Sequence, residues 1–232
     1  MGYYTQKLSG RRLMECYRVA TPRVKQYLES EISHVKYRLG PNATVLELGC
    51  GYGRVAFELA GVARKVVGID TAAESLKLAR ELGADMPNCE FIEMDAADLK
   101  FPDGVFDVVV CIQNGICVFG VDQARLFGEA LRVARPGGRV IFSSYSPRFW
   151  EHRLEWFTIQ AARGLVGEID YELTGDNVIV CRDGFRAGAM DETDFRKLCG
   201  RCGIESAITE IDNSSIFCEV IKNWSANSTQ LP

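Results

Sequence analysis

The sequence has few of the features that mark membrane or secreted proteins. Its most apolar stretch, residues 105–119, contains Asp107, Gln113 and Asn114 and is too short to span a bilayer. The first residues, MGYYTQKLSGRR, lack the apolar core of a signal peptide. The nine cysteines show no framework spacing and are odd in number, which is typical of a compartment where thiols stay reduced. We therefore expect a cytoplasmic protein without a membrane segment.

The residues of metal sites and of imidazole chemistry are also scarce. Cys199 and Cys202 form one C-x-x-C pair, and the sequence has no second pair that would complete a zinc site. Cysteines at this spacing near a helix end are more often packing residues, so we expect no metal. His34 and His152 are the only histidines, and each is a candidate general base. Lone histidines are more often surface or packing residues, so the sequence assigns no catalytic residue.

Positive charge is limited except near the N-terminus. The chain carries a formal charge of −4, but residues 1–40 hold eight Lys or Arg against three Glu, which leaves −9 for the remainder. This polarity favours an anionic substrate, yet it falls short of the clustered basic face that binds a phosphate backbone. Nucleic acid is therefore not an expected partner, and nothing in the sequence indicates the oligomeric state.

The chain of 232 residues, 47% hydrophobic and 25% charged, is suited to one folded domain. Short apolar runs alternate with helical patterns, which predicts βαβ units and a parallel sheet. Thr71 and Glu74 form a capping box, and Pro136-Gly137-Gly138 is expected to end a helix. The expected strands are residues 43–49, 65–70, 89–94, 106–112, 139–144, 205–211 and 215–221, and the expected helices are 55–61, 71–82, 123–134 and 191–202.

Two flanking segments surround this alternating core, residues 41–146. Residues 1–40 form a helical cap, in which Thr21-Pro22 begins an amphipathic helix. Residues 147–190 are an insertion and possible substrate lid, with a helix followed by a hairpin at 169–181. Residues 191–222 supply a closing helix and hairpin, and residues 223–232 a flexible tail. Six aromatic residues of the flanks line a substrate pocket or pack in the core, and the sequence does not decide between these: Tyr3, Tyr4, Tyr17, Trp150, Trp156 and Phe157.

The turn after the first strand, ELGCGYGR, carries three glycines where the chain must bend sharply into a helix. Such a turn brings backbone N–H groups and a helix N-terminus close to a nucleotide-like ligand. In the dinucleotide pattern G-x-G-x-x-G the third glycine follows the first by five positions, but Arg54 stands there. Here the third glycine is Gly53, four positions after Gly49, and Glu47 precedes Gly49 by two.

This arrangement resembles motif I of the class I, Rossmann-like S-adenosylmethionine-dependent methyltransferases, an acidic residue followed by x-G-x-G-x-G. The match is complete at Glu47, Gly49, Gly51 and Gly53. The resemblance implies an α/β fold with a seven-stranded, mostly parallel sheet and helices on both faces. It extends to Ser144, because the EALRVARPGGRVIFSS segment is similar to the family's region before its fifth strand.

Two acidic residues downstream fit the same family. Asp70 ends the second strand in VVGID, where a carboxylate can accept from both ribose hydroxyls of an adenosine cofactor, nicotinamide cofactors included. Asp95 follows the third strand, and the resemblance implies that it accepts from the adenine amino group while the Ala96 N–H meets a ring nitrogen. Gln113, at the end of the fourth strand, is expected near the methionine part, although it equally fits a local backbone role.

The resemblance thus implies methyl transfer from S-adenosylmethionine, which leaves S-adenosylhomocysteine. The fourth strand ends in Cys-Ile-Gln-Asn instead of Asn/Asp-Pro-Pro-aromatic, which favours a small-molecule acceptor over a base or a glutamine. A methyltransferase-like protein that binds the cofactor without turnover stays open, and a nicotinamide-dependent oxidoreductase is the weaker alternative. The predicted cofactor-binding residues are Glu47, Gly49, Cys50, Gly51, Gly53, Asp70, Thr71, Asp95, Ala96 and Gln113.

Overall fold

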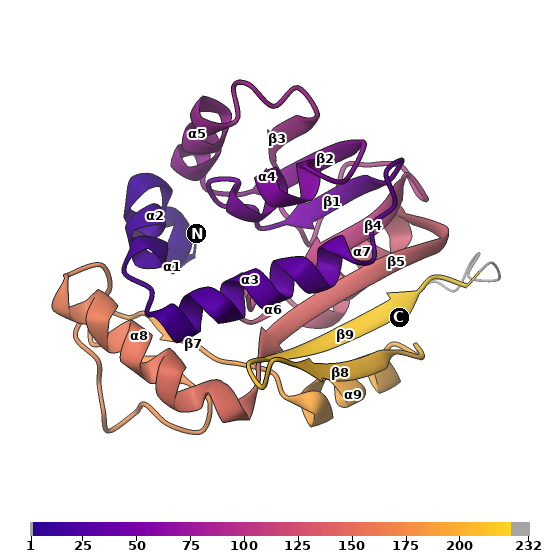
Figure 1. Cartoon of the computed structure of the whole chain (residues 1–232). Coiled ribbons are helices and arrows are strands. Elements are labelled where there is room, and N and C mark those ends of the chain that lie inside the picture. The colour runs from indigo at the N-terminus through magenta and orange to yellow at the C-terminus, as the bar shows by residue number, and fades with distance from the viewer. Residues whose placement is uncertain (1, 224–232) are drawn as a thin grey trace.

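Seven strands form a single sheet in the computed structural model, which describes residues 2–223. The sheet order is β3-β2-β1-β4-β5-β9-β8, and β9 runs in the opposite direction to the other six strands of this sheet (Figure 1). The predicted α/β fold with a mostly parallel sheet is therefore confirmed. The strands are β1 (Thr44–Leu48), β2 (Lys65–Asp70), β3 (Cys89–Glu93), β4 (Phe106–Cys111), β5 (Ala134–Tyr145), β8 (Ala207–Ile211) and β9 (Ser215–Ile221).

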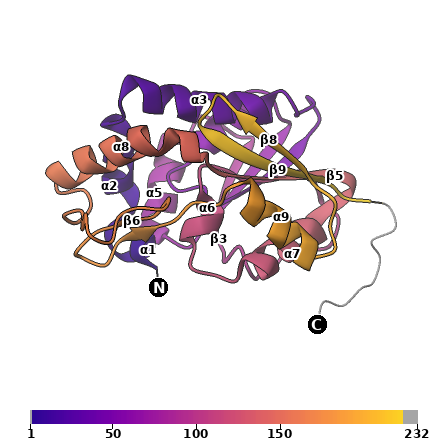
Figure 2. The ribbon, with the colours of Figure 1, turned by 90° about the horizontal axis from the view of Figure 1, so that it is seen from below.

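Helices cover both faces of this sheet. On one face lie α3 (Pro22–Lys36), α4 (Arg54–Ala60) and α5 (Ala73–Leu82), and on the other lie α7 (Gln123–Val133) and α9 (Glu192–Arg201). Figure 2 shows α3 and α9 on opposite sides of β8 and β9. Side chains of the central strands alternate between the two apolar cores, as Val45 and Leu46 of β1 do. Burial on both faces explains why these strands are apolar throughout.

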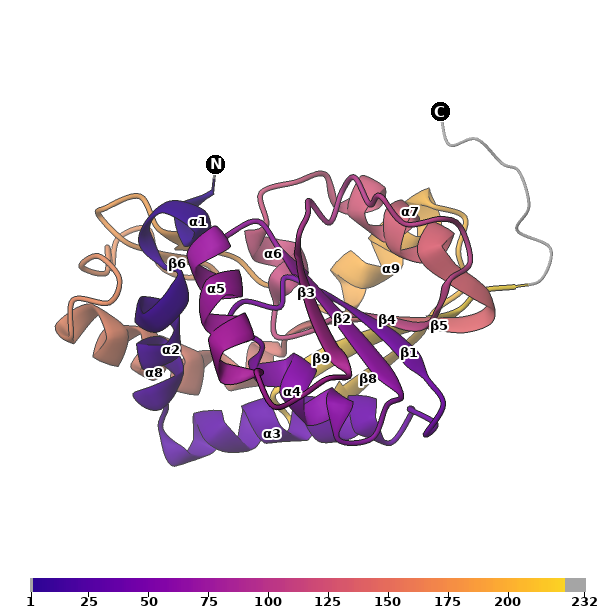
Figure 3. The same cartoon turned by 90° about the horizontal axis from the view of Figure 1, so that it is seen from above.

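The N-terminal cap consists of α1 (Tyr3–Lys7), α2 (Gly10–Arg18) and the long α3. The Thr21 hydroxyl accepts a hydrogen bond from the Val24 N–H at 3.4 Å, with Pro22 in the first turn, so the predicted start of this helix is confirmed. α2 lies beside α5, where the Gly10 N–H donates to the Ser75 hydroxyl over 2.9 Å (Figure 3). The cap therefore stands over the carboxyl end of β2.

The insertion after β5 packs against this cap. A 3₁₀ turn at Pro147–Phe149 leads into α8 (Trp150–Ala162), which is the predicted helix. The predicted hairpin is present as an antiparallel bridge between Ile169 and Cys181. It continues into a pairing that the sequence does not reveal, between the two-residue strands β6 (Ile179–Val180) and β7 (Arg186–Ala187). Apolar side chains of the insertion share one cluster with Leu8 and Cys16 of the cap.

Two local predictions are wrong. The Thr71/Glu74 capping box does not form, because α5 begins at Ala73 with Ala72 as its N-cap. The Asp70 carboxylate takes the Ala72 N–H instead, at 2.8 Å, and so delays the helix start. Pro136-Gly137-Gly138 does not end α7, which stops at Val133; these residues lie inside β5, where the register with β4 shifts.

The C-terminal helix and hairpin agree closely with the sequence prediction. Asp191 caps α9 with a capping box to Asp194. Asp212 and Asn213 connect β8 to β9 with φ of 55° and 49°, a left-handed conformation that Asp and Asn tolerate. The short helix α6 (Gly115–Val118) after β4 was not predicted. The predicted tail lies outside the described residues from 224 onward.

Candidate functional site

A cavity of about 680 Å³ opens at the carboxyl ends of β1, β2 and β4. Its floor is the glycine-rich turn between β1 and α4, and its cover comes from α1 and α2, which contribute Tyr4, Leu13 and Tyr17. Nine of the ten predicted binding residues line it. They are Glu47, Gly49, Cys50, Gly51, Asp70, Thr71, Asp95, Ala96 and Gln113.

Gly53 is the predicted residue that does not line the cavity. It is the N-cap of α4 with φ of 88°, a conformation that is strained for any side chain. A Cβ at this position would lie 2.7 Å from Cζ of Phe57 and 2.9 Å from Cζ of Phe91. The third glycine of the motif therefore allows α4 to begin against β3, and its role is in the shape of the turn.

Backbone hydrogen bonds hold the turn against β2. The N–H groups of Gly49 and Cys50 both donate to the Ile69 carbonyl, at 2.8 and 2.9 Å. The Gly51 N–H donates to Asp70 Oδ2 over 2.8 Å. Burial raises the pKa of Asp70, and its backbone hydrogen bonds oppose that rise. A carboxylate has about four acceptor sites, so Asp70 keeps acceptor capacity toward the cavity.

Glu47 is a carboxylate on the cavity wall without a protein partner for one of its oxygens. It is 4% exposed, and Oε2 has no hydrogen-bond partner among the described residues. Burial raises its pKa to about 8, although the charge of Arg54 acts in the opposite direction. Since buried polar atoms are nearly always satisfied, the free oxygen indicates a ligand donor in the cavity.

Arg54 is a site residue that the sequence argument used only to exclude a dinucleotide motif. It begins α4, lines the cavity and donates through Nη2 to Oε1 of Gln113. Its guanidinium lies 4.3 Å from the centre of the Tyr17 ring, and its Nε has no partner among the described residues. Its position directly after the third glycine is the sequence feature that could have identified it as a cavity residue.

Gln113 stands in a strained position that a buried glutamate supports. Its φ is 57°, and its N–H donates to Oε2 of Glu31 on α3 over 2.7 Å and to the Ser143 hydroxyl over 2.9 Å. The Ser215 hydroxyl donates to the other oxygen of Glu31 at 2.6 Å. Burial raises the pKa of Glu31 to about 7 against these hydrogen bonds. Glu31 thus ties α3, β4, β5 and β9 together behind the cavity.

Asp95 and Ala96 occupy the loop after β3 and line the cavity there. Asp95 Oδ1 accepts from the Ala97 N–H over 2.8 Å, so the carboxylate also shapes its own turn. Thr71, at the end of β2, lies between this loop and α1, with its hydroxyl 3.2 Å from that of Thr5. The cavity is therefore walled by β2, the β3–β4 loop and the N-terminal cap.

The candidate bases and the candidate metal ligands lie elsewhere. His34 is buried with Nε2 2.9 Å from Oε1 of Glu219, and His152 is half-exposed on α8; neither lines the cavity. Cys199 contacts Cys218, with 3.6 Å between the sulfurs. Within residues 2–223 no group of three or more His, Cys, Asp or Glu side chains could hold a metal ion. Across the same residues, no helix combines the length and apolarity needed to cross a bilayer.

The flanking aromatics divide between the two roles. Tyr4 and Tyr17 line the cavity, whereas Trp156 and Phe157 are buried in the packing between cap and insertion.

Comparison with known proteins agrees with this arrangement. The family model described as "Methyltransferase domain" matches residues 45–138, which contain the glycine-rich turn, Asp70 and Asp95. The 2-methyl-6-phytyl-1,4-hydroquinone methyltransferase of Synechocystis is 33% identical over 147 residues. Over residues 45–138 the chain is therefore similar to the class I S-adenosylmethionine-dependent methyltransferases.

The aligned lengths show how far this similarity extends. The aligned region covers 56% of the chain and 46% of the Synechocystis protein. A fatty-acid O-methyltransferase of Mycolicibacterium smegmatis is 34% identical over 116 residues, which cover 47% of the chain and 41% of that protein. The chain thus spans under half the length of these relatives. An S-adenosylmethionine-dependent methyltransferase of Aquifex aeolicus shares the fold, with a TM-score of 0.60 and 16% identity over 90% of this chain and 97% of that one.

Proposed function

We propose that this protein transfers a methyl group from S-adenosylmethionine to a small-molecule acceptor. The observation that carries the proposal is the cavity at the carboxyl edge of the sheet. Four segments far apart in the sequence, after β1, β2, β3 and β4, contribute predicted binding residues to that one cavity. Ligands of open α/β sheets bind at this edge.

The chemistry of the walls suits each part of the cofactor. Asp95 and Ala96 would hold the adenine, and Asp70 the ribose hydroxyls. Glu47 and Arg54 stand on either side of the glycine-rich turn. Each has a buried atom without a hydrogen-bond partner among the described residues, an acceptor oxygen (Oε2) in Glu47 and a donor nitrogen (Nε) in Arg54. A zwitterionic amino-acid group fits such a pair, with its ammonium at Glu47 and its carboxylate at Arg54. This assignment explains why neither atom has a protein partner.

The protein's part in the transfer is mainly alignment. The bound sulfonium supplies an already activated methyl group, so the residues must hold the acceptor atom in line and exclude water. Neither His34 nor His152 lines the cavity, so we propose that the transfer does not depend on an imidazole base. Gln113, fixed by Glu31 and Arg54, borders the side where an acceptor would enter.

The acceptor would lie beneath the N-terminal cap and the insertion. Two relatives are named for small, largely apolar molecules, a phytyl hydroquinone and a fatty acid. Tyr4, Leu8, Leu13 and Tyr17 give the cover of the cavity an apolar and aromatic character. We therefore extend the class of small organic acceptors to this chain.

Cofactor titration tests the first half of the proposal. Isothermal titration of the wild type should detect S-adenosylmethionine and S-adenosylhomocysteine but not NADH. Asp70→Ala should weaken the affinity about 10- to 100-fold, since hydrogen bonds to a charged group are lost. Asp85→Ala, an exposed carboxylate on the loop before β3, is the matched control. Tight NADH binding without a response to S-adenosylmethionine would contradict the proposal.

Turnover tests the second half. A panel of hydroxyl, thiol, amine and carboxylate acceptors should include at least one that yields S-adenosylhomocysteine. A protein that binds the cofactor tightly and methylates none of them would instead be the binding protein without turnover.

A further inference from the structure

Arg153 on α8 is a buried cation without an anionic partner. Its side chain is 1% exposed, and none of the ion pairs among the described residues includes it. The guanidinium donates to three backbone carbonyls, those of Asn177, Ala187 and Gly188, at 2.9, 2.7 and 3.0 Å. Its Nε has no partner among the described residues.

Hydrogen bonds to three backbone carbonyls do not fully offset the cost of burying the positive charge of Arg153. Taking a guanidinium out of water is costly unless an anion compensates it, and arginine stays charged at any physiological pH. The Tyr145 ring, whose centre lies 4.4 Å from the guanidinium carbon, offsets part of that cost. A neutral donor would hold the same carbonyls without burying a charge. The buried guanidinium therefore has the capacity to bind an anionic partner.

The position of Arg153 connects it to the edge of the sheet where the cavity opens. The Gly188 carbonyl accepts from Arg153 and also from Nδ2 of Asn114, at 2.9 Å. Asn114 follows Gln113, which lines the cavity, at the end of β4. Tyr145 is the last residue of the neighbouring strand β5. Arg153 thus lies beside the carboxyl ends of β4 and β5.

Three tyrosines lie near Arg153 or its helix α8, and two of them also line the cavity. Tyr27 packs on the same Tyr145 ring with 5.2 Å between centres, and its buried hydroxyl interacts with that of Tyr145. Burial raises the pKa of Tyr4, which lines the cavity, and the nearby charge of Arg153 works against that rise. Tyr17, also a cavity residue, packs on Trp156 of α8. Aromatic hydroxyls and one cation therefore gather between the cavity and α8.

We propose that Arg153, with the Tyr27 hydroxyl beside it, recognises an anionic oxygen group of the methyl acceptor, a carboxylate or a phosphoryl group. The inference rests on the proposed function, because it assigns the substrate class of the same site. A guanidinium matches both groups through paired N–H donors. The acidic body of the protein would repel such an acceptor, and the positive charge of Arg153 would offset that repulsion.

Matched pairs of probes test the proposal in the complex with S-adenosylhomocysteine. The pairs are octanoate with octanamide, benzoate with benzamide, and phenyl phosphate with phenol, titrated by calorimetry. We expect the anion of at least one pair to bind about 10- to 100-fold more tightly than its neutral partner. Arg153→Met should remove that preference and leave the affinity of the neutral partner unchanged. Arg163→Met, an exposed position at the end of the same helix, is the control and should keep it.

Arg153→Lys covers the case in which the methionine variant does not fold. It keeps the charge but loses the fork of N–H donors, so the preference for the anion should fall about tenfold while circular dichroism stays native. Equal binding of anions and neutral partners across the panel would overturn the proposal, as would an unchanged preference in folded Arg153→Met. The readout is binding, so an absence of turnover would count against the proposed function alone. If S-adenosylhomocysteine does not bind, that function fails, and the same pairs are titrated into the unliganded protein.

Discussion

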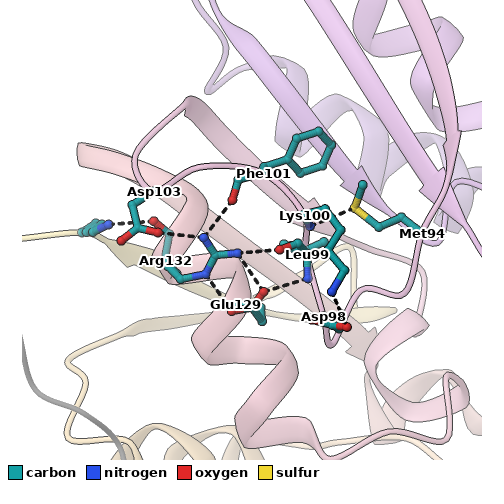
Figure 4. A network of polar contacts seen from close by, with 9 residues as sticks. Met94, Asp98, Leu99, Lys100, Phe101, Asp103, Glu129 and Arg132 are labelled. Carbon is teal, nitrogen blue, oxygen red and sulfur yellow. Dashed lines mark hydrogen bonds and ion pairs between the residues drawn. The ribbon is translucent and has the colours of Figure 1, made fainter.

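Arg132 on α7 donates from its guanidinium to the Leu99 carbonyl over 2.8 Å, and this contact fixes the loop that follows Asp95 and Ala96 (Figure 4). The same guanidinium donates to the Phe101 carbonyl over 2.9 Å. Glu129, its ion-pair partner, accepts the Leu99 N–H over 2.7 Å. One helix thereby satisfies both backbone groups of Leu99. The wall that the β3–β4 loop gives to the cavity therefore depends on Arg132 and Glu129, which do not themselves line the cavity.

Arg132→Met should weaken the binding of S-adenosylmethionine although residue 132 does not touch the cavity. The loop loses its hydrogen bonds to α7, so we expect about a 5- to 30-fold loss of affinity by calorimetry and a lower melting temperature. Arg135→Met is the control, because Arg135 is more exposed and pairs with Asp107 instead. An unchanged affinity in folded Arg132→Met would show that the loop is held without this pair.

Gly53→Ala and Gly51→Ala should separate the shape of the turn from its contact with the cofactor. Gly53→Ala meets Phe57 and Phe91 at positive φ, so the unfolding free energy should fall by about 1–3 kcal/mol, with the affinity of the folded protein within about threefold of wild type. Gly51 has φ of 54° and lines the cavity, so Gly51→Ala should lose both stability and affinity. Urea unfolding and calorimetry measure the two effects. Equal affinity losses in both variants would contradict this division.

Two buried glutamates should make the protein less stable as the pH rises. Burial raises the pKa of Glu31 to about 7 and that of Glu47 to about 8, whereas both titrate near 4.5 when unfolded. Between these values the native state binds more protons than the unfolded state, so the unfolding free energy falls with rising pH. The slope should reach at most about 1.4 kcal/mol per pH unit for each glutamate. Urea titrations from pH 5 to 8 measure it, and Glu47→Gln should flatten the upper half of the curve. A rise in stability over this range would contradict the assignment.

Loss of either histidine should leave methyl transfer intact. His34 binds Glu219, whose pKa is held at about 2 by His34 and Arg38 although burial opposes this. His34→Gln should therefore lower the unfolding free energy by about 1–2 kcal/mol, while turnover stays within about threefold of wild type. His152→Gln, on a half-exposed position, should change neither quantity. A folded His34→Gln protein without turnover would restore His34 as a candidate base.

Much of the fold could be predicted because its signals are local. The bounds of β2 and the N-cap of α3 follow from apolar runs, turn residues and a hydroxyl before proline, all of which act within a few residues. The same holds for Asp191 at the start of α9. The predictions that failed were also local ones, at Thr71 and at Pro136-Gly137-Gly138. At Thr71, the Asp70 carboxylate bonds the Ala72 N–H and the helix starts later than predicted. At Pro136-Gly137-Gly138, the pairing of β5 with β4 takes these residues into the strand.

The sequence by itself determined the spacing of Glu47, Gly49, Gly51 and Gly53, and with it the cofactor class, because these residues lie within seven positions at the end of one strand. Only the tertiary structure decided which of these residues line the cavity. It moved Gly53 from the wall to the packing of α4 and brought Arg54 and Tyr17 into the wall. It also buried Arg153 without an anion beside the ends of β4 and β5. Burial and ion pairing depend on which distant segments pack together, and a local sequence pattern does not predict that packing.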